Sequence, residues 1–176
     1  MGAKRMTVAR GADAQSMAVQ TTALRLAFEA VARRQAAMPF FRKDLAVEVL
    51  AFRSWQDAWV GALITPWCLD VVAIPKERGS WDRLCVGDGC GWGFPAGTCE
   101  LLVADVGGLG RYQSAVLFSP LTDFAHQREI RKAARAALDM LFAEATTPCP
   151  MPPVPAADGG RPVLTRRAFV RGAWRQ

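Results

Sequence analysis

The apolar residues of the chain recur with different spacings, and these spacings predict its elements. Residues 1–20 mix Ala, Gly, Gln and charged residues without a strong period, so we expect a frayed, flexible N-terminus. Thr21 or Thr22 can then cap a helix that ends by Pro39. The apolar stripe of this helix follows at helical spacing: Leu24, Phe28 and Val31.

Three apolar runs come next, and their Val, Leu and Ile content predicts strands: residues 45–52, 59–65 and 68–74. In the first run Val47 and Val49 should face one way, because side chains alternate along a strand. Pro66 separates the second run from the third. Since proline donates no hydrogen bond to a ladder, we place it at a strand end or a bulge.

Residues 75–97 are rich in glycine and charged residues, which predicts a long loop with a short strand near residues 81–86. Residues 98–106 and 112–118 have the composition of two further strands. The glycines within residues 107–110 permit positive φ angles, so we expect a hairpin between these strands.

The most regular helical pattern follows. Thr122 or Asp123 starts it, and it ends before Thr147. Its apolar stripe consists of Ile130, Ala134, Ala137, Leu138 and Leu141. The order of helix, several strands and helix predicts an α+β fold. We expect a mostly antiparallel sheet with an N-terminal and a C-terminal helix packed on it.

Beyond this helix the chain is rich in proline and glycine, which is typical of a linker. We therefore divide the chain into four segments. They are a flexible N-terminus (1–20), a folded domain (21–146), a Pro/Gly linker (147–162) and a basic tail (163–176).

The composition, with 51% hydrophobic and 22% charged residues, is that of a globular protein. No apolar run approaches the roughly 20 residues that span a bilayer. The first residues also lack the continuous apolar stretch of a secretion signal. The cysteine count is 5, an odd number without paired spacing, which argues against a disulfide framework. We therefore expect a protein that folds and stays in the cytoplasm.

The net charge of +6 is unevenly divided along the chain. Lys and Arg outnumber Asp and Glu in residues 1–43 and 158–176, whereas the acidic residues outnumber the basic ones in residues 44–157. A nucleic-acid-binding protein is expected to carry positive charge on its folded domain, so we expect no nucleic-acid partner. An acidic body is compatible with a basic peptide as partner.

Residues suited to catalysis are scarce. His126 has no evident triad partner, and Ser114 and Ser119 lack the strained Gly-x-Ser-x-Gly turn of a nucleophile. Residues 107–111 lack the Lys-Ser/Thr pair that completes a phosphate-binding loop. We therefore expect no catalytic residues. A hydrolase is an alternative that would need a pocket around His126.

Cys85, Cys90 and Cys99 suggest a second alternative, a small metal-carrier or redox protein. Zinc and rubredoxin-type iron sites use cysteine pairs separated by two residues, because this spacing lets both thiolates face one metal ion. No pair here has that spacing. We expect these cysteines to act as small apolar side chains, and we expect no metal and no cofactor.

Aromatic residues are frequent near prolines and glycines. Any one of them is expected in the core, where aromatic side chains contribute most. The stretch Trp92-Gly93-Phe94-Pro95 is different, because loop aromatics flanked by glycine are often partly exposed. This stretch favours a surface that binds a protein or a peptide.

Three motifs occur in a fixed order. Residues 45–52 lead into Gly61-Ala62-Leu63-Ile64-Thr65-Pro66-Trp67, then comes Phe94-Pro95-Ala96-Gly97, and then Leu109-Gly110-Arg111-Tyr112-Gln113-Ser114 with Leu117-Phe118-Ser119-Pro120. In this order they resemble the HybE-like [NiFe]-hydrogenase assembly chaperones. The resemblance covers roughly residues 24–143.

The resemblance implies a cytoplasmic and non-catalytic role. Such chaperones help to assemble [NiFe] uptake hydrogenases and bind the precursor of the small subunit, whose signal peptide carries a twin-arginine motif. Binding would delay export until the cofactors are in place, and the large subunit stays open as a further partner. The motif positions are our candidates for a binding surface: Thr65, Pro66, Trp67, Phe94, Pro95, Gly97, Tyr112, Gln113, Phe118, Ser119 and Pro120.

The tail carries one more motif. The stretch Thr165-Arg166-Arg167-Ala168-Phe169-Val170-Arg171 resembles the twin-arginine consensus, Ser/Thr-Arg-Arg-x-Phe-Leu-Lys. No apolar region follows it, so it is not an export signal. Two interpretations stay open. It is a basic disordered tail, or it is a mimic that occupies the chaperone's own signal-peptide site or engages a partner that reads the motif.

Overall fold

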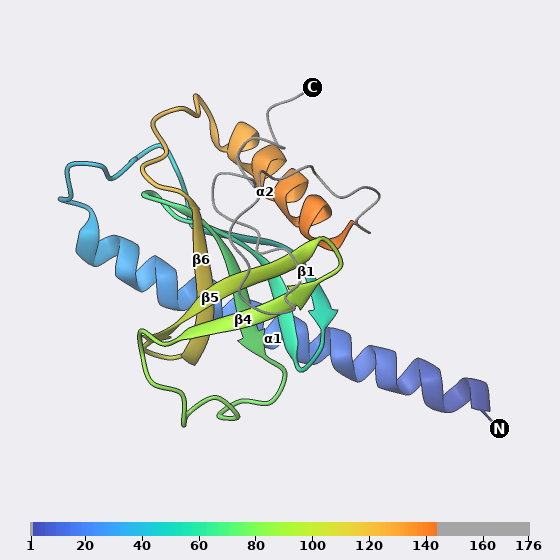
Figure 1. Cartoon of the computed structure of the whole chain (residues 1–176). Coiled ribbons are helices and arrows are strands. Elements are labelled where there is room, and N and C mark those ends of the chain that lie inside the picture. Colours follow the sequence, from blue (N-terminus) through green and yellow to red (C-terminus); the bar gives the residue numbers. More distant parts are fainter. Residues whose placement is uncertain (1, 144–176) are drawn as a thin grey trace, which may run out of the picture.

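The computed structural model describes the backbone of residues 2–143 and the side chains of residues 13–143. The elements are α1 (Gly2–Gln35), β1 (Glu48–Trp55), β2 (Ala58–Ile64), β3 (Leu69–Pro75), β4 (Gly89–Phe94), β5 (Gly97–Val106), β6 (Gly110–Phe118) and α2 (Gln127–Phe142) (Figure 1). The predicted α+β fold, an antiparallel sheet with an N-terminal and a C-terminal helix packed on it, is confirmed. The predicted linker and tail, residues 147–162 and 163–176, lie outside the described residues.

The six strands form one antiparallel sheet in the order β1-β2-β3-β6-β5-β4. Two three-stranded meanders thus meet along the pairing of β3 with β6. Every residue of β2 and β3 is buried, as expected for continuous apolar strands that are covered on both faces. The strand predictions for these two runs are confirmed, and Pro66 lies in the connection between them.

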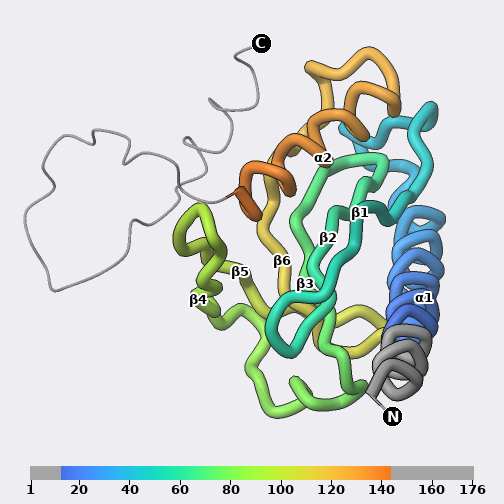
Figure 2. The backbone as a smooth tube through the Cα atoms, turned by 90° about the vertical axis from the view of Figure 1, so that its right-hand side faces the viewer, coloured from blue at the N-terminus to red at the C-terminus, as the bar shows by residue number. Residues whose placement is uncertain are grey.

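The two helices cover opposite faces of the sheet (Figure 2). Val71 and Ala73 of β3 pack in the cluster that includes the stripe of α2. Val72 and Ile74 pack with residues of α1 in a second cluster. The alternation of side chains along a strand therefore divides the apolar residues into two cores.

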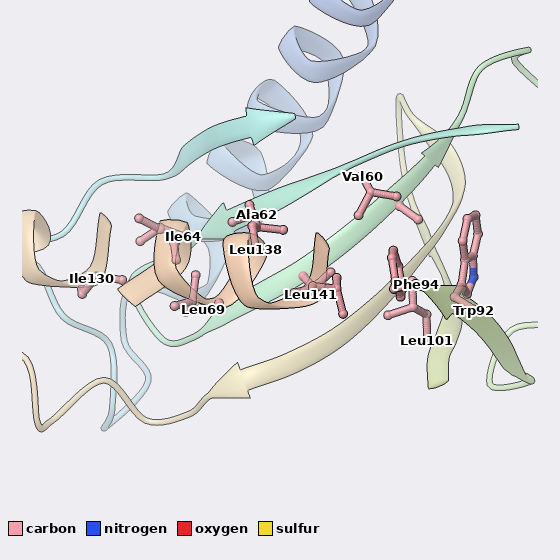
Figure 3. Packing of buried hydrophobic residues seen from close by; sticks show 14 of the residues in the cluster. Val60, Ala62, Ile64, Leu69, Trp92, Phe94, Leu101, Ile130, Leu138 and Leu141 are labelled. Carbon is pink, nitrogen blue, oxygen red and sulfur yellow. The ribbon is translucent and has the colours of Figure 1, made fainter. Parts of the chain in front are cut away.

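Helix α2 buries the five residues of its predicted stripe. Figure 3 shows Ile130, Leu138 and Leu141 over the sheet, with Ile130 near Leu69 and Leu141 toward Phe94. The helix begins at Gln127, so the predicted start at Thr122 or Asp123 is wrong. The segment before the helix instead forms turns that bury Leu121 and Phe124.

Helix α1 begins at Gly2, so the predicted start at Thr21 or Thr22 is wrong. Leu24, Ala27 and Phe28 pack against the sheet, as the periodic stripe predicted. The earlier segment has no such stripe but is rich in Ala, Met, Gln and Arg, which have high intrinsic helix propensity. Periodicity could not detect a helix that continues by propensity.

None of the described helices is both long and apolar enough to cross a membrane.

Two strands differ from their predicted positions. Strand β1 begins and ends later in the chain than the predicted run of residues 45–52. It contains a bulge, where Ala51 has a φ of 55°. Strand β4 lies inside the predicted loop but not at residues 81–86. Its alternate residues are Gly89, Gly91 and Gly93, and these glycines conceal the pattern of a strand.

Candidate functional site

The structure separates the candidate binding residues into two groups near opposite ends of α2 and a pair within the sheet. The first group, which we call the Trp67 end, lies beside the start of α2 and consists of Thr65, Pro66, Trp67, Phe118, Ser119 and Pro120. The second group surrounds the turn between β4 and β5, where α2 ends. The sequence predicted one surface, whereas the fold places these residues in three separate parts of the molecule.

At the Trp67 end, the turn between β2 and β3 is held by Thr65. The Thr65 hydroxyl oxygen accepts hydrogen bonds from the backbone N–H of Cys68 (3.0 Å) and from that of Trp67 (3.4 Å). The backbone N–H of Thr65 donates to the Cys68 carbonyl (2.9 Å). Thr65 and Pro66 are buried, while Trp67 is half-buried. The buried residues of this motif therefore build a turn that presents the tryptophan.

Arg42 joins two loops to this turn, the loop between α1 and β1 and the loop between β6 and α2. Its Nη1 donates to the carbonyls of Leu121 (2.9 Å) and Phe124 (2.7 Å). Its backbone N–H donates to the Pro66 carbonyl (2.9 Å). The hydrogen bonds from the Arg42 guanidinium also hold the pKa of Asp44 down to about 2. One residue thus links segments that lie far apart in sequence, and sequence reasoning missed it because no local pattern marks it.

Aromatic contacts complete the Trp67 end. The rings of Trp67 and Phe41 lie 6.2 Å apart, and those of Phe118 and Phe124 meet edge to face at 5.2 Å. The Ser119 hydroxyl donates to the Trp67 carbonyl (3.3 Å), and both Ser119 and Pro120 are exposed. The result is a partly apolar surface on a frame fixed by hydrogen bonds.

A hollow of about 400 Å³ adjoins this surface. Pro66 of the Trp67 end and the neighbouring Phe41 contribute to its lining, and Arg33 and Glu29 contribute from α1. Lys43 adds a second basic side chain. Charges of both signs therefore surround an opening that is partly apolar, which suits a peptide-like ligand better than a single ion.

Cys68 lies beneath this surface. Its thiol donates to Asp70 Oδ2 at 3.4 Å and lies 3.2 Å from the Thr65 hydroxyl. Burial, and then the charge of Asp70, raise the pKa of the Cys68 thiol far above its ordinary value. A cysteine that stays protonated is a poor nucleophile and a poor metal ligand, so Cys68 serves the fold of the turn.

The second group contains Phe94, Pro95 and Gly97. Phe94 is only 2% exposed, so the expectation that Trp92 and Phe94 are partly exposed is wrong. Phe94 stacks on Trp55 and meets the edge of Phe142, with ring centroids at 5.9 and 5.4 Å. Gly97 has a φ of 144°, which favours glycine in the turn. These residues hold the hairpin to α2 more than they form a surface.

The remaining pair lies on opposite faces of β6. Tyr112 meets Phe28 of α1 edge to face at 5.8 Å, while Gln113 Oε1 accepts from Trp92 Nε1 at 2.7 Å on the α2 side. Burial, helped by the charge of Asp70, raises the pKa of Tyr112 to about 12. Both residues are buried, so they fasten the two cores to the sheet.

The residues of the two alternative functions do not form a site in residues 13–143. Cys90 and Cys99 lie on neighbouring strands and Cys85 in an exposed turn, and no three His, Cys, Asp or Glu side chains gather there to hold a metal. His126 is exposed at the start of α2 and its side chain makes no capping hydrogen bond. Neither the metal-carrier nor the hydrolase alternative gains support.

Known proteins are similar to this chain in sequence and in fold. A family model described as "[NiFe]-hydrogenase assembly, chaperone, HybE" matches residues 19–172. The hydrogenase expression/formation protein HupT of Azotobacter chroococcum is 35% identical over 147 residues, which cover 83% of this chain and 90% of the relative. The hydrogenase-2 operon protein HybE of Escherichia coli K12 is 32% identical over 142 residues, covering 80% of this chain and 85% of that protein.

The solution structure of HybE from Escherichia coli superposes with a TM-score of 0.58 at 28% identity, covering 80% of this chain and 85% of that one. The fold, the motifs and these matches define an assembly chaperone for a metalloenzyme. The chain belongs to the HybE family of [NiFe]-hydrogenase assembly chaperones. The family match extends through the tail as far as residue 172, beyond the region in which the motifs were found.

Proposed function

We propose that this chain is a cytoplasmic, non-enzymatic chaperone that binds the small-subunit precursor of a [NiFe] hydrogenase, with its twin-arginine signal peptide, before export. The match to the family model over residues 19–172 carries this proposal. The names of HupT and HybE both refer to hydrogenases, which supports a hydrogenase subunit as the ligand. The large subunit is a second candidate partner.

The exposed part of the Trp67 end is the surface that we assign to the precursor. Trp67 and Phe118 are half-buried, and Ser119 and Pro120 are exposed beside them. Partly buried aromatic residues contribute much of the binding energy at protein interfaces. Because hydrogen bonds already hold this frame, little conformational entropy is lost when a partner binds. Thr65 and Pro66 contribute by shaping the turn.

A pull-down with the small-subunit precursor tests this function. We expect the full chain to retain the precursor and to lose most of it when the signal peptide is removed. Trp67→Ala should weaken retention at least tenfold, whereas Val19→Ala, at an exposed position of α1, should leave it unchanged. Ser119→Glu places a charge on the same surface at an exposed position and guards against a folding defect in the tryptophan variant. Binding to neither form of the precursor would refute the proposal.

A further inference from the structure

Strand β4 is an edge of the sheet with an open backbone. Its ladder pairs with β5 alone, and Val103 donates to the Asp88 carbonyl at 2.9 Å where that ladder begins. In an antiparallel pair, successive residues direct their N–H and C=O groups alternately toward the partner strand and away from it. Gly89, Gly91 and Gly93 therefore direct their backbone groups outward.

One contact shows this direction. The Gly93 carbonyl accepts hydrogen bonds from Trp55 Nε1 (3.1 Å) and Gln56 Nε2 (3.4 Å), which belong to the β1–β2 hairpin and not to β5. The outward groups of Gly91 and Gly89 have no such partner within residues 13–143. The edge is closed at one end by Trp55 and open along the rest.

Nothing in the described fold requires glycine at position 91. Its φ is not positive, and a Cβ added there would meet only Thr98 Cγ2, at 3.9 Å. At Gly89 the nearest obstacle is the flexible carboxylate of Glu100. Proteins ordinarily protect an edge strand with charges, proline or a bulge. A glycine inside a strand often marks a bulge, a tight bend or the close approach of another backbone, and the register of β4 with β5 has no bulge at Gly91.

We propose that residues 163–172 of the same chain bind along this edge by strand addition. The described chain stops close by, because the Phe142 ring lies 5.4 Å from that of Phe94 and the Leu141 carbonyl accepts from Ala96 N–H at 3.3 Å. About 20 residues separate this point from residue 163, and an extended proline-rich chain of that length reaches roughly 60 Å. The tether gives the segment an effective concentration on the order of millimolar.

The chemistry of the two partners is complementary. Residues 163–172 contain three arginines, including Arg166 and Arg167, and no acidic residue. The edge presents Asp88 and Glu100, both exposed, at its Gly89 end. Beside them Leu102 pairs with Gly89 across the hairpin and is 52% exposed, so it offers an apolar contact. The family match includes this segment.

While residues 163–172 occupy this edge, an extended segment of a partner could add to β4 only by displacing them. Such a segment would therefore have to bind the edge more tightly than the tethered residues do. This competition rests on the proposed chaperone function, whereas the docking of the segment does not.

A matched pair of variants tests the docking. Gly91→Pro removes the outward N–H without removing a bond to β5, while Gly91→Ala keeps that N–H and fits the available space. The probe is a fluorescent peptide with the sequence of residues 163–172. In full-length protein carrying Arg166→Glu and Arg167→Glu, the peptide should bind at least tenfold more tightly than in the wild type. The amides of residues 89–91 should also exchange at least tenfold faster with solvent.

Added to that double variant, Gly91→Pro should abolish peptide binding and Gly91→Ala should preserve it. Glu100→Lys should weaken the peptide several-fold, and Asp123→Lys, an equal charge change beside the other end of α2, should not. Equal exchange and equal peptide affinity in the wild type and the double variant would overturn the proposal. If the precursor binds but the peptide does not dock, the docking proposal fails and the chaperone function stands. If the peptide docks but the precursor does not bind, the chaperone function fails and the docking proposal stands.

Discussion

The two ends of α2 are stabilised by different means. At the Trp67 end, side-chain hydrogen bonds from Thr65 and Arg42 fix the loops, and the aromatic side chain of Trp67 stays half-exposed. At the β4–β5 hairpin, aromatic stacking fixes the strands, and the backbone edge stays exposed. The comparison teaches that the two ends expose different chemical groups, an aromatic side chain at the Trp67 end and main-chain groups at the β4 edge. A partner meets side chains at one end and main chain at the other.

The largest effect should come from the hairpin. Phe94→Ala removes a ring that contacts Trp55, Trp92 and Phe142, and we expect the free energy of unfolding to fall by about 3–5 kcal/mol. Urea titration followed by tryptophan fluorescence measures the change. Leu102→Ala, at an exposed position of the same hairpin, should change stability by less than about 0.5 kcal/mol. Similar losses in both variants would contradict the importance of the buried stack.

The Trp67 end should respond less. Arg42→Ala leaves the carbonyls of Leu121 and Phe124 without their charged donor, and we expect a loss of about 2 kcal/mol. The loss should appear with reduced retention of the precursor, since the frame around Trp67 loosens. Arg128→Ala, at an exposed position of α2, is the matched control and should behave like the wild type. An Arg42→Ala protein of unchanged stability would show that Thr65 suffices.

Tyr112 lies in the sheet, and its ionisation should change the stability of the fold at high pH. Its pKa of about 12 lies above the unfolded value near 10, so its contribution to stability is present below pH 10 and is lost as the pH rises toward 12. Since Tyr112 is the chain's single tyrosine, absorbance at 295 nm follows its ionisation directly. We expect a late titration in the folded protein and a titration near pH 10 in urea. Tyr112→Phe should reduce the alkaline loss of stability.

The smallest effect should appear in acid at the Trp67 end. The pKa of Asp44, about 2, lies below the unfolded value near 4 because Arg42 binds the ionised carboxylate. Its contribution is therefore present above pH 4 and is lost as the pH falls toward 2. Asp44→Asn should flatten the change in thermal midpoint between pH 4 and pH 2 slightly, and Asp123→Asn should not. A carbon NMR titration of the Asp44 carboxyl checks the value itself.

The elements that the sequence predicted best are those whose apolar residues form a regular pattern, either repeated at helical spacing or continuous along a strand. The stripe of α2 and the continuous runs of β2 and β3 are such elements, and each is buried as expected. The first half of α1 and strand β4 escaped detection. The first half of α1 has residues of high helix propensity but no apolar stripe. In β4 every second residue is a glycine, so no alternation of side chains is visible in the sequence.

The candidate site was predicted in part. The Thr65-Pro66-Trp67 and Phe118-Ser119-Pro120 motifs lie together, although more than fifty residues of sequence separate them. Arg42 could not be predicted, because its role depends on carbonyls contributed by a distant segment. The exposure expected for Phe94 failed because a ring beside glycines can also be covered by a neighbouring strand and helix.

The seam between β3 and β6 has a consequence for biosynthesis. The meander β1-β2-β3 leaves the ribosome well before β6 and α2, and its inner face, with Val60 and Val71, is covered only when α2 arrives. Contacts between distant segments form slowly because loop closure precedes them. We therefore expect the nascent chain to pass through a stage with uncovered apolar surface. This member of an assembly-chaperone family is therefore itself expected to expose a surface that other proteins could bind while it is being made.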